Sequence, residues 1–277
     1  MNVGSGYEVA ALWRYPVKSM LGERVEAADL DVDGVVGDRR WGVRRLTTGR
    51  LASAKKTRPF GGLLHWTASM VDDNVEVRSP DGEVWLAGDP ALDEALSAAF
   101  GESVAMAAME ADREESYDIE WEQIPGALPG VTMKAPVAGY TASSSFVDAS
   151  AVHLVTTGSI DHLSSLIGAQ VPVERFRPTA LLRSLDDEGS AGFSDLDWGE
   201  VSATLGGVGL RMGGPTPRCV MTTLSQSGLE QDRGPLQALS ANARRDTAIG
   251  RMPCLGTMAE VQSSGNVRIG DRFALGD

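Results

Sequence analysis

One cysteine lies in a segment whose composition suits a metal ligand. Cys219 follows Arg218 in GGPTPRCVMTT, residues 213–223, where two prolines and two glycines predict a rigid, irregular turn. A cysteine on such a turn beside a guanidinium is expected to favour its thiolate, the form that binds soft metals. The alternative is a buried structural thiol, which is the commoner fate of a single cysteine. The segment alone leaves both interpretations open.

Other conventional metal ligands are scarce in this chain. It has two cysteines, Cys219 and Cys254, and three histidines, with no CxxC motif. A structural zinc site needs four closely spaced Cys or His ligands, and a conventional iron–sulfur cluster needs four thiolates, so the sequence excludes both. Cys254, in PCLGT, is interpreted as a packed thiol at the start of a strand. A metal held by Cys219 must therefore take most of its ligands from elsewhere.

Basic residues are concentrated in one part of an acidic chain. Residues 14–58 carry eleven basic and six acidic side chains, although the net charge of the whole chain is −13. A second basic group comprises Arg175, Arg177, Arg183 and, later, Arg218. A local positive field can attract a small anion such as phosphate. Charge alone nevertheless favours the other explanation, in which these residues line a solvated strand face.

The elements that must position these residues are mostly strands. Period-two alternation in EVAALWRYPV, residues 8–17, predicts a strand with Val9, Ala11, Trp13, Tyr15 and Val17 on one face. SSGN, residues 263–266, predicts a hairpin turn. Helices are predicted over 89–101, 158–168 and 235–246, the first with Asp89 as N-cap and Gly101 just past its end. The expected fold class is mostly β with a few helices (α+β), as in barrels or sandwiches.

An acidic segment divides the chain. Seven acidic residues lie between Glu110 and Glu122, followed by Pro125 and Pro129. We expect an N-terminal β-rich domain at 1–115, an acidic Pro/Gly linker at 116–132 and a C-terminal β-barrel domain at 133–277.

Composition and hydropathy exclude several classes of protein. The N-terminus lacks the basic and apolar regions of a secretory signal, and no 18-residue apolar stretch predicts a transmembrane helix. The acidic charge argues against binding to nucleic acid or to an anionic membrane. We therefore expect a cytoplasmic protein with neither kind of partner.

Several motifs follow one another in order along nearly the whole chain. They are YPVKS (15–19), GDRRW (37–41), ASAKKTRP (52–59), FVDASAVHLVTTGSI (146–160), RFRPTALL (175–182), DWGE (197–200), PTPRCVMTT (215–223) and PCLGTMAEVQSSGNVRIGDRF (253–273). Together they resemble the MOSC family, named for molybdenum-cofactor sulfurase C-terminal domains. The chain is most similar to the long form that has an N-terminal MOSC β-barrel domain, as in the mitochondrial amidoxime-reducing component and bacterial relatives.

This resemblance implies specific site residues. The family's molybdenum ligand is the cysteine of its Arg-Cys motif, which corresponds to Cys219, here both the catalytic and the metal-binding residue. The residues that hold the pterin and its phosphate correspond to Lys18, Ser19, Arg39, Asp148, Ser150, Arg177, Thr179 and Arg218. Thr179 departs from the family pattern, because relatives often have an asparagine there, which offers both donors and an acceptor.

The resemblance also implies a function. It indicates a molybdenum-cofactor (Mo-molybdopterin) oxidoreductase that removes oxygen from small N-hydroxylated substrates, such as amidoximes, with the hard chemistry supplied by the cofactor. Because no flavin, haem or iron–sulfur module is recognisable, the electrons are expected from a separate protein. The alternatives are sulfur transfer through a persulfide on Cys219, a carrier that binds the cofactor without catalysis, and a member whose pocket is empty.

Overall fold

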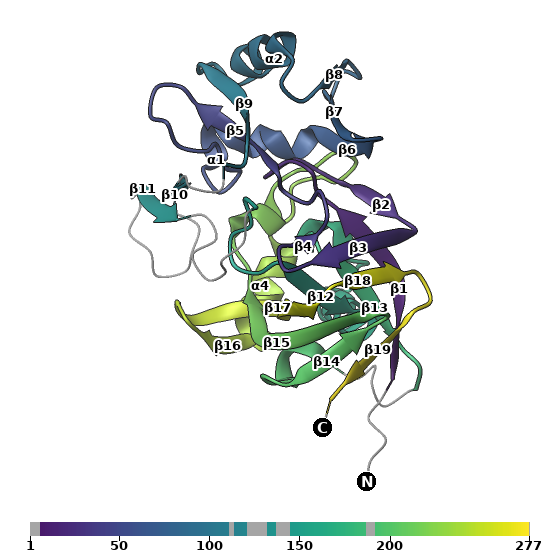
Figure 1. The fold of residues 1–277 in the computed structure, drawn as a ribbon. Coiled ribbons are helices and arrows are strands. Elements are labelled where there is room, and N and C mark those ends of the chain that lie inside the picture. The colour runs from purple at the N-terminus through teal and green to yellow at the C-terminus, as the bar shows by residue number, and fades with distance from the viewer. Residues whose placement is uncertain (1–5, 111–113, 121–131, 137–144, 187–191, 277) are drawn as a thin grey trace.

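The computed structural model describes residues 6–110, 114–120, 132–136, 145–186 and 192–276 (Figure 1). Its largest sheet contains seven strands that form a closed ring, because the last strand, β17, also pairs with the first, β12. In ring order these are β12 (Val152–Thr156), β13 (Ala180–Ser184), β1 (Tyr7–Arg14), β19 (Arg272–Leu275), β14 (Ser202–Leu205), β15 (Val208–Pro217) and β17 (Gly250–Ser263). The predicted fold class, mostly β with a few helices, is confirmed.

The ring is antiparallel except for one pair. β12 and β13 run parallel, with Leu154 opposite Ala180, and α3 (Thr157–Ile167) lies between them in the chain, as a parallel connection requires. Shorter strands extend the ring: β2 (Glu23–Val25) pairs with β1, and β16 (Arg244–Thr247) pairs with the start of β17. A small sheet follows the order β18 (Gly265–Arg268), β3 (Ala27–Asp31) and β4 (Gly34–Val35).

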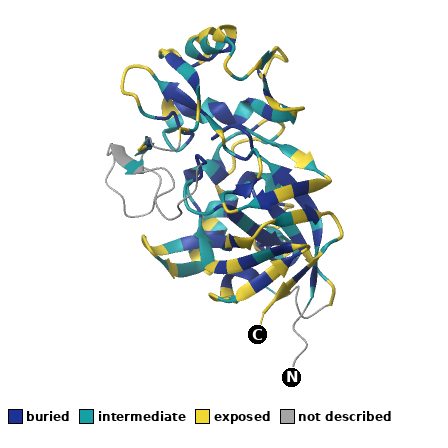
Figure 2. Ribbon diagram, in the orientation of Figure 1, coloured by how far each residue is buried: buried dark blue, intermediate teal, exposed yellow. Residues whose placement is uncertain are grey.

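A second body of structure lies above the barrel in Figure 1. It contains the pair β5 (Trp41–Arg45) and β9 (Val104–Ala108), and the meander β6 (Thr67–Val71), β7 (Asn74–Arg78) and β8 (Val84–Leu86). Its helices are α1 (Thr57–Phe60), the 3-10 helix η1 (Gly61–His65) and α2 (Pro90–Phe100). The buried residues of this body form a hydrophobic core distinct from that of the barrel. Figure 2 shows buried residues in dark blue in both bodies.

Local signals account for the helix that was predicted first. The side chain of Asp89 accepts a hydrogen bond from Ala91 N at 2.9 Å, Pro90 opens α2, and Gly101 ends it in the left-handed conformation. Leu92, Leu96 and Phe100 point into the core. The prediction over 89–101 is confirmed. The prediction over 235–246 is too long, because α4 (Gly234–Asn242) ends before β16 begins.

A β-bulge alters the predicted pattern of β1. The pairing of β1 with β13 shifts register between Val9 and Ala11. Because such a shift turns the following side chains to the other face, Val9 packs in the barrel core, whereas Ala11, Trp13 and Tyr15 form a separate cluster. The prediction that all of these residues share one face is therefore wrong. Because of the bulge, Tyr15 is directed away from the barrel core.

The predicted hairpin turn at 263–266 is also wrong. Gly209 of β15 lies opposite Ser263 of β17, whereas Gly265 of β18 lies opposite Leu30 of β3. The chain therefore passes at this point from the barrel sheet to the small β18–β3–β4 sheet, and Ser264 and Gly265 lie at this crossing and not in a hairpin turn. No helix in the described part of the chain combines the length and the apolar character needed to cross a bilayer.

Five short elements complete the described part of the chain. They are the 3-10 helices η3 (Val173–Phe176), η5 (Ser194–Asp197) and η6 (Val220–Thr223), and the antiparallel pair β10 (Ser116–Glu120) and β11 (Thr132–Pro136). β10 and β11 stand at the two ends of the predicted linker, whose residues 121–131 lie outside the described part. The division at 1–115, 116–132 and 133–277 stays a prediction.

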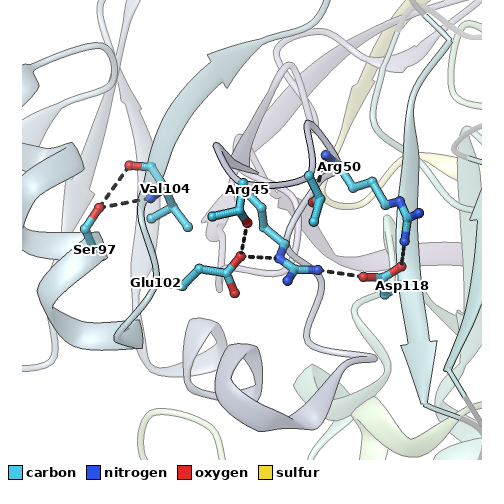
Figure 3. Close-up of polar contacts among 8 residues, drawn as sticks. Arg45, Arg50, Ser97, Glu102, Val104 and Asp118 are labelled. Carbon is cyan, nitrogen blue, oxygen red and sulfur yellow. Dashed lines mark hydrogen bonds and ion pairs between the residues drawn. The ribbon is translucent and has the colours of Figure 1, made fainter.

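Ion pairs attach β10 to β5. The guanidinium of Arg44 donates to both carboxylate oxygens of Glu115, at 2.8 and 2.5 Å, and both side chains are buried. Asp118 accepts from Arg45 and from Arg50, each at 2.6 Å, and Arg45 also binds Glu102 at 2.7 Å (Figure 3). Three of the eleven basic residues at 14–58 therefore pair with two acids of the acidic segment, which the sequence pattern did not predict.

The buried Arg44–Glu115 pair allows a test of this attachment. Replacing Glu115 with Ala leaves the Arg44 guanidinium buried without its carboxylate, which is expected to lower the free energy of unfolding by about 3–5 kcal/mol. The matched control is Arg183→Ala, because Arg183 is 63% exposed in its pair with Glu8 and should contribute less than about 1 kcal/mol. Urea unfolding measures both, and equal losses would contradict a buried anchoring role for Glu115.

Candidate functional site

Cys219 is half-buried at the end of β15, where the chain turns into η6. The Thr222 hydroxyl donates to the Cys219 carbonyl at 3.0 Å, which holds the turn. Arg218 points inward: its Nε and Nη2 atoms donate to the Leu255 carbonyl, and its Nη1 atom donates to Phe176 O at 3.1 Å. Its guanidinium therefore braces the cysteine turn against β17 and η3.

His153, in strand β12 of the barrel, lies next to Arg218. Its ring contacts the Arg218 guanidinium and lies 3.3 Å from the Leu255 carbonyl. Burial, together with the charge of Arg218, lowers the pKa of His153 well below its usual range, so the ring is neutral. The interpretation of His153 as a strand residue whose ring is satisfied is confirmed. Cys254, the other cysteine, is fully buried, as predicted for a packed thiol.

A lysine cluster, formed by Lys18, Lys55, Asp148 and Tyr117, lies in the same region. The Lys18 ammonium donates to Phe146 O at 2.9 Å and to one oxygen of Asp148. The Lys55 ammonium binds the other Asp148 oxygen at 3.0 Å and donates to the Tyr117 hydroxyl at 2.9 Å. One carboxylate thus serves two ammonium groups, which leaves an excess of positive charge in the cluster.

The protonation states follow from these contacts. Burial lowers the pKa of Lys18 to about 8, an effect that Lys55 reinforces and Asp148 opposes. Burial acts in the same direction on Lys55, but the nearby groups Asp148, Tyr117 and Cys219 outweigh it and raise its pKa well above the ordinary value. Burial alone would raise the pKa of Asp148, yet the two ammonium groups hold it well below its usual range.

An arginine stack, formed by Arg39, Tyr15 and Arg177, continues the positive region. The guanidinium carbons of Arg39 and Arg177 lie 5.1 and 4.3 Å from the centre of the Tyr15 ring. Arg39 is paired with Asp38, and Arg177 donates to the Met20 carbonyl. The Arg177 Nη2 atom and the Tyr15 hydroxyl are buried with no hydrogen-bond partner among the described residues. Buried polar groups of this kind normally have a hydrogen-bond partner, so these two atoms are candidates to bind a ligand.

Backbone strain coincides with the predicted site. Four non-glycine residues in the described part of the chain have positive φ, and three of them are Ser19 (66°), Arg39 (49°) and Arg177 (50°). This left-handed conformation is uncommon for residues with a side chain, and such outliers cluster where function requires a particular geometry. The fold therefore holds these predicted cofactor residues in backbone conformations that the sequence would not choose locally.

The predicted hydroxyl residues are engaged within the protein. Ser19 Oγ accepts from Ala54 N at 3.1 Å, and Ser150 Oγ bonds to the carbonyls of Val152 and Ala259. Thr179 Oγ1 accepts from His153 N at 3.1 Å. Thr179, which stands where relatives have asparagine, therefore uses its hydroxyl between β12 and β13. The cofactor-binding roles of these residues stay predictions.

Sequence reasoning did not select three members of the site. Tyr15 is expected on the strand face with Val9, Lys55 appears only among the basic residues at 14–58 and in ASAKKTRP, and Tyr117 lies inside the predicted linker. The available signal for a strand there is the alternation of Tyr117 and Ile119 with the polar residues Ser116, Asp118 and Glu120. Within the described residues, no three His, Cys, Asp or Glu side chains gather as a metal site. The arrangement can hold an anion beside an accessible thiol.

The low pKa of Lys18 predicts pH-dependent anion binding. Sulfate, whose charge is constant in this range, should bind more weakly as pH rises through about 8, because the Lys18 ammonium loses its proton there and not near its ordinary 10.5. Calorimetric titration between pH 6.5 and 9.5 measures this effect. A Lys18→Met variant should bind sulfate more weakly at pH 7 and show a flatter profile. A constant affinity of the unmodified chain up to pH 9.5 would contradict the assignment.

Comparison with known proteins identifies the domains of the chain. Two family models match the chain: the MOSC N-terminal beta barrel domain over residues 6–111 and the MOSC domain over residues 141–274. Mitochondrial amidoxime reducing component 2 of Rattus norvegicus is 27% identical over 131 residues, 46% of this chain and 37% of that protein. Mitochondrial amidoxime-reducing component 1 of Mus musculus is 25% identical over 135 residues, 47% of this chain and 38% of that protein.

The matched segment thus spans less than two fifths of each of these relatives. Among solved structures, the YUAD protein from Bacillus subtilis has a TM-score of 0.47 and 12% identity, over 97% of this chain and 94% of that one. Since the two family models together match most of the chain, the chain belongs to the MOSC family, with a MOSC N-terminal beta barrel domain followed by a MOSC domain.

Proposed function

We propose that this chain binds a molybdenum–pterin cofactor and reduces N-hydroxylated compounds with electrons from a separate protein. The observation that carries the proposal is an accessible thiol, Cys219, beside buried cations that outnumber the carboxylates near them. Lys55 connects the two features, because the Cys219 thiol lies close enough to affect its pKa. The names of the relatives, which describe amidoxime reduction, support the substrate class.

The residues present fit such a group. A pterin cofactor carries a phosphate, and the arginine stack offers Arg177 Nη2 and the Tyr15 hydroxyl as buried groups with unused hydrogen-bonding capacity. Lys18 and Arg39 add positive charge on the same side. Cys219 would be the protein's ligand to the metal, since thiolates bind metals of sulfur-rich sites. The Thr216 hydroxyl, three residues before Cys219, is also buried and finds no hydrogen-bond partner within the described part of the chain.

Each protein group then has a definite task. When bound, the cofactor would supply the two-electron chemistry that removes oxygen from an N–O bond, so that N–OH, two electrons and two protons become N–H and water. Arg218 holds the Cys219 turn in place through the carbonyls of Leu255 and Phe176. Lys18, Arg39 and Arg177 neutralise the phosphate and fix its position.

Replacement of Cys219 with Ala is expected to abolish both molybdenum content and amidoxime reduction while leaving the fold intact. The protein is produced in a molybdenum-replete host, molybdenum is measured by elemental analysis, and turnover is measured with a chemical electron donor. The matched control is Cys254→Ala, which removes the other, fully buried thiol, on β17 opposite Pro217, and should keep the metal. Full metal retention by Cys219→Ala would reject the ligand assignment.

The same measurement separates the alternatives. Persulfide transfer through Cys219 requires no stoichiometric molybdenum in the purified chain. A cofactor carrier would contain molybdenum but show no turnover of an amidoxime.

A further inference from the structure

We propose that Lys55 is a further anion-binding residue of this site and that Tyr117 is the residue that positions it. The inference deepens the proposed function and rests on it for the identity of the ligand. The chemistry recognised is an anionic oxygen, either of a bound phosphate or of the substrate. Cys219 is among the groups that raise the pKa of Lys55, and Arg39 is among those that lower the pKa of Lys18.

The first argument is the unequal charge of the lysine cluster. Lys18 and Lys55 bind opposite oxygens of Asp148, so a single negative charge faces two positive ones. A buried charge without a counter-ion is costly, and fixed excess charge in a partly enclosed site attracts a ligand of opposite sign. The cluster is therefore electrostatically incomplete until an anion binds.

The second argument is access. The Lys18 side chain is 5% exposed and also donates to the Phe146 carbonyl. The Lys55 side chain is 14% exposed, and its partner Asp148 is the most open of the three, at 34%. An ammonium has three donors, and two of those of Lys55 are used, by Asp148 and Tyr117. Within the described residues, Lys18 and Lys55 each use two donors, so what distinguishes Lys55 is that its ammonium group is the more accessible of the two.

Tyr117 fixes where the third donor of Lys55 points. Its hydroxyl accepts from Lys55 at 2.9 Å, and its ring lies below both ammonium groups, 4.6 Å from Lys18 Nζ and 4.9 Å from Lys55 Nζ. A lysine side chain has high rotamer entropy when it is unrestrained. Because Tyr117 is 3% exposed and rigidly packed with Leu51 and Phe146, it supplies a fixed wall for a flexible side chain.

The ion pairs on either side hold Tyr117 at this place. Glu115, two residues before Tyr117, binds Arg44. Asp118, the residue after Tyr117, binds Arg45 and Arg50 (Figure 3). In a strand, alternate residues face opposite sides, so these anchors restrain both faces of β10. The acidic character of this segment thus serves to attach a tyrosine to the site.

A double-mutant cycle tests the proposal on the full chain, purified without cofactor at pH 7. Tyr117→Phe keeps the ring and removes the hydroxyl, and Lys55→Met keeps the chain length and removes the charge. Each single variant is expected to weaken pyrophosphate binding, measured by calorimetry, by about tenfold. Because Tyr117 acts through Lys55, the double variant should bind no more weakly than Lys55→Met alone.

The control is Tyr7→Phe, which removes the hydroxyl of another buried tyrosine, in the barrel core, and should not change the pyrophosphate affinity. Thermal unfolding of every variant checks that the fold is retained. If Tyr117→Phe does not fold, Lys55→Met alone still tests the binding role. The proposal is overturned if the unmodified chain does not bind pyrophosphate, if Lys55→Met or a folded Tyr117→Phe binds it normally, or if the two losses are additive.

The loaded protein identifies the source of the anionic oxygen. If Lys55 serves the cofactor phosphate, Lys55→Met lowers molybdenum content but leaves turnover per molybdenum unchanged. If it serves the substrate, molybdenum content is retained and the KM for an amidoxime rises. Pyrophosphate binding that depends on Lys55, in a chain that never acquires molybdenum, would support this inference while refuting the proposed function.

Discussion

One carboxylate, that of Asp148, lies between the ammonium groups of Lys18 and Lys55. The site depends on this ion cluster, in which two positive charges face one negative charge. Lys18 and Lys55 belong to the N-terminal part of the chain, whereas Asp148 precedes β12 of the barrel. The ion cluster therefore joins the two bodies of the structure at the place where a ligand would bind. Neither lysine would be stable as an isolated buried charge. The carboxylate makes their proximity possible, and the remaining positive charge gives the site its preference for anions.

The arginine stack extends this preference through a different interaction. Arg39 and Arg177 approach the Tyr15 ring from strained backbone conformations, one from the N-terminal body and one from the segment after η3. Such strain persists only where the surrounding structure determines the conformation. Here the barrel and the N-terminal core, each with its own hydrophobic cluster, provide that support. The ligand-binding groups thus lie on turns and connections between elements, next to the two hydrophobic cores.

The fold class and the positions of the main motifs could be predicted from sequence because they depend on local signals. Alternating apolar residues identified the strands, and Asp89, Pro90 and Gly101 identified α2. The β-bulge in β1 could not be predicted, because no glycine or proline marks it, and it decides that Tyr15 enters the arginine stack. Pairing of β18 with β3 is a long-range choice that the Ser-Gly turn signal does not encode.

The candidate site was predictable only as far as motif resemblance extended. Lys18, Arg39 and Arg177 came from motifs in known relatives, and the structure brings them together with Asp148. The role of β10 was hidden, because a run of acidic residues is typical of a solvated linker. Only the fold places the guanidinium groups of Arg44, Arg45 and Arg50 opposite those acids.

The most direct test of the account is an anomalous difference map, collected at the molybdenum absorption edge, from crystals of protein produced in a molybdenum-replete host. The account predicts one strong peak at bonding distance from Cys219 Sγ, with density for a phosphate beside Arg39 and Arg177. A map in which the Cys219 sulfur has no metal neighbour, or in which the peak lies elsewhere, would contradict it.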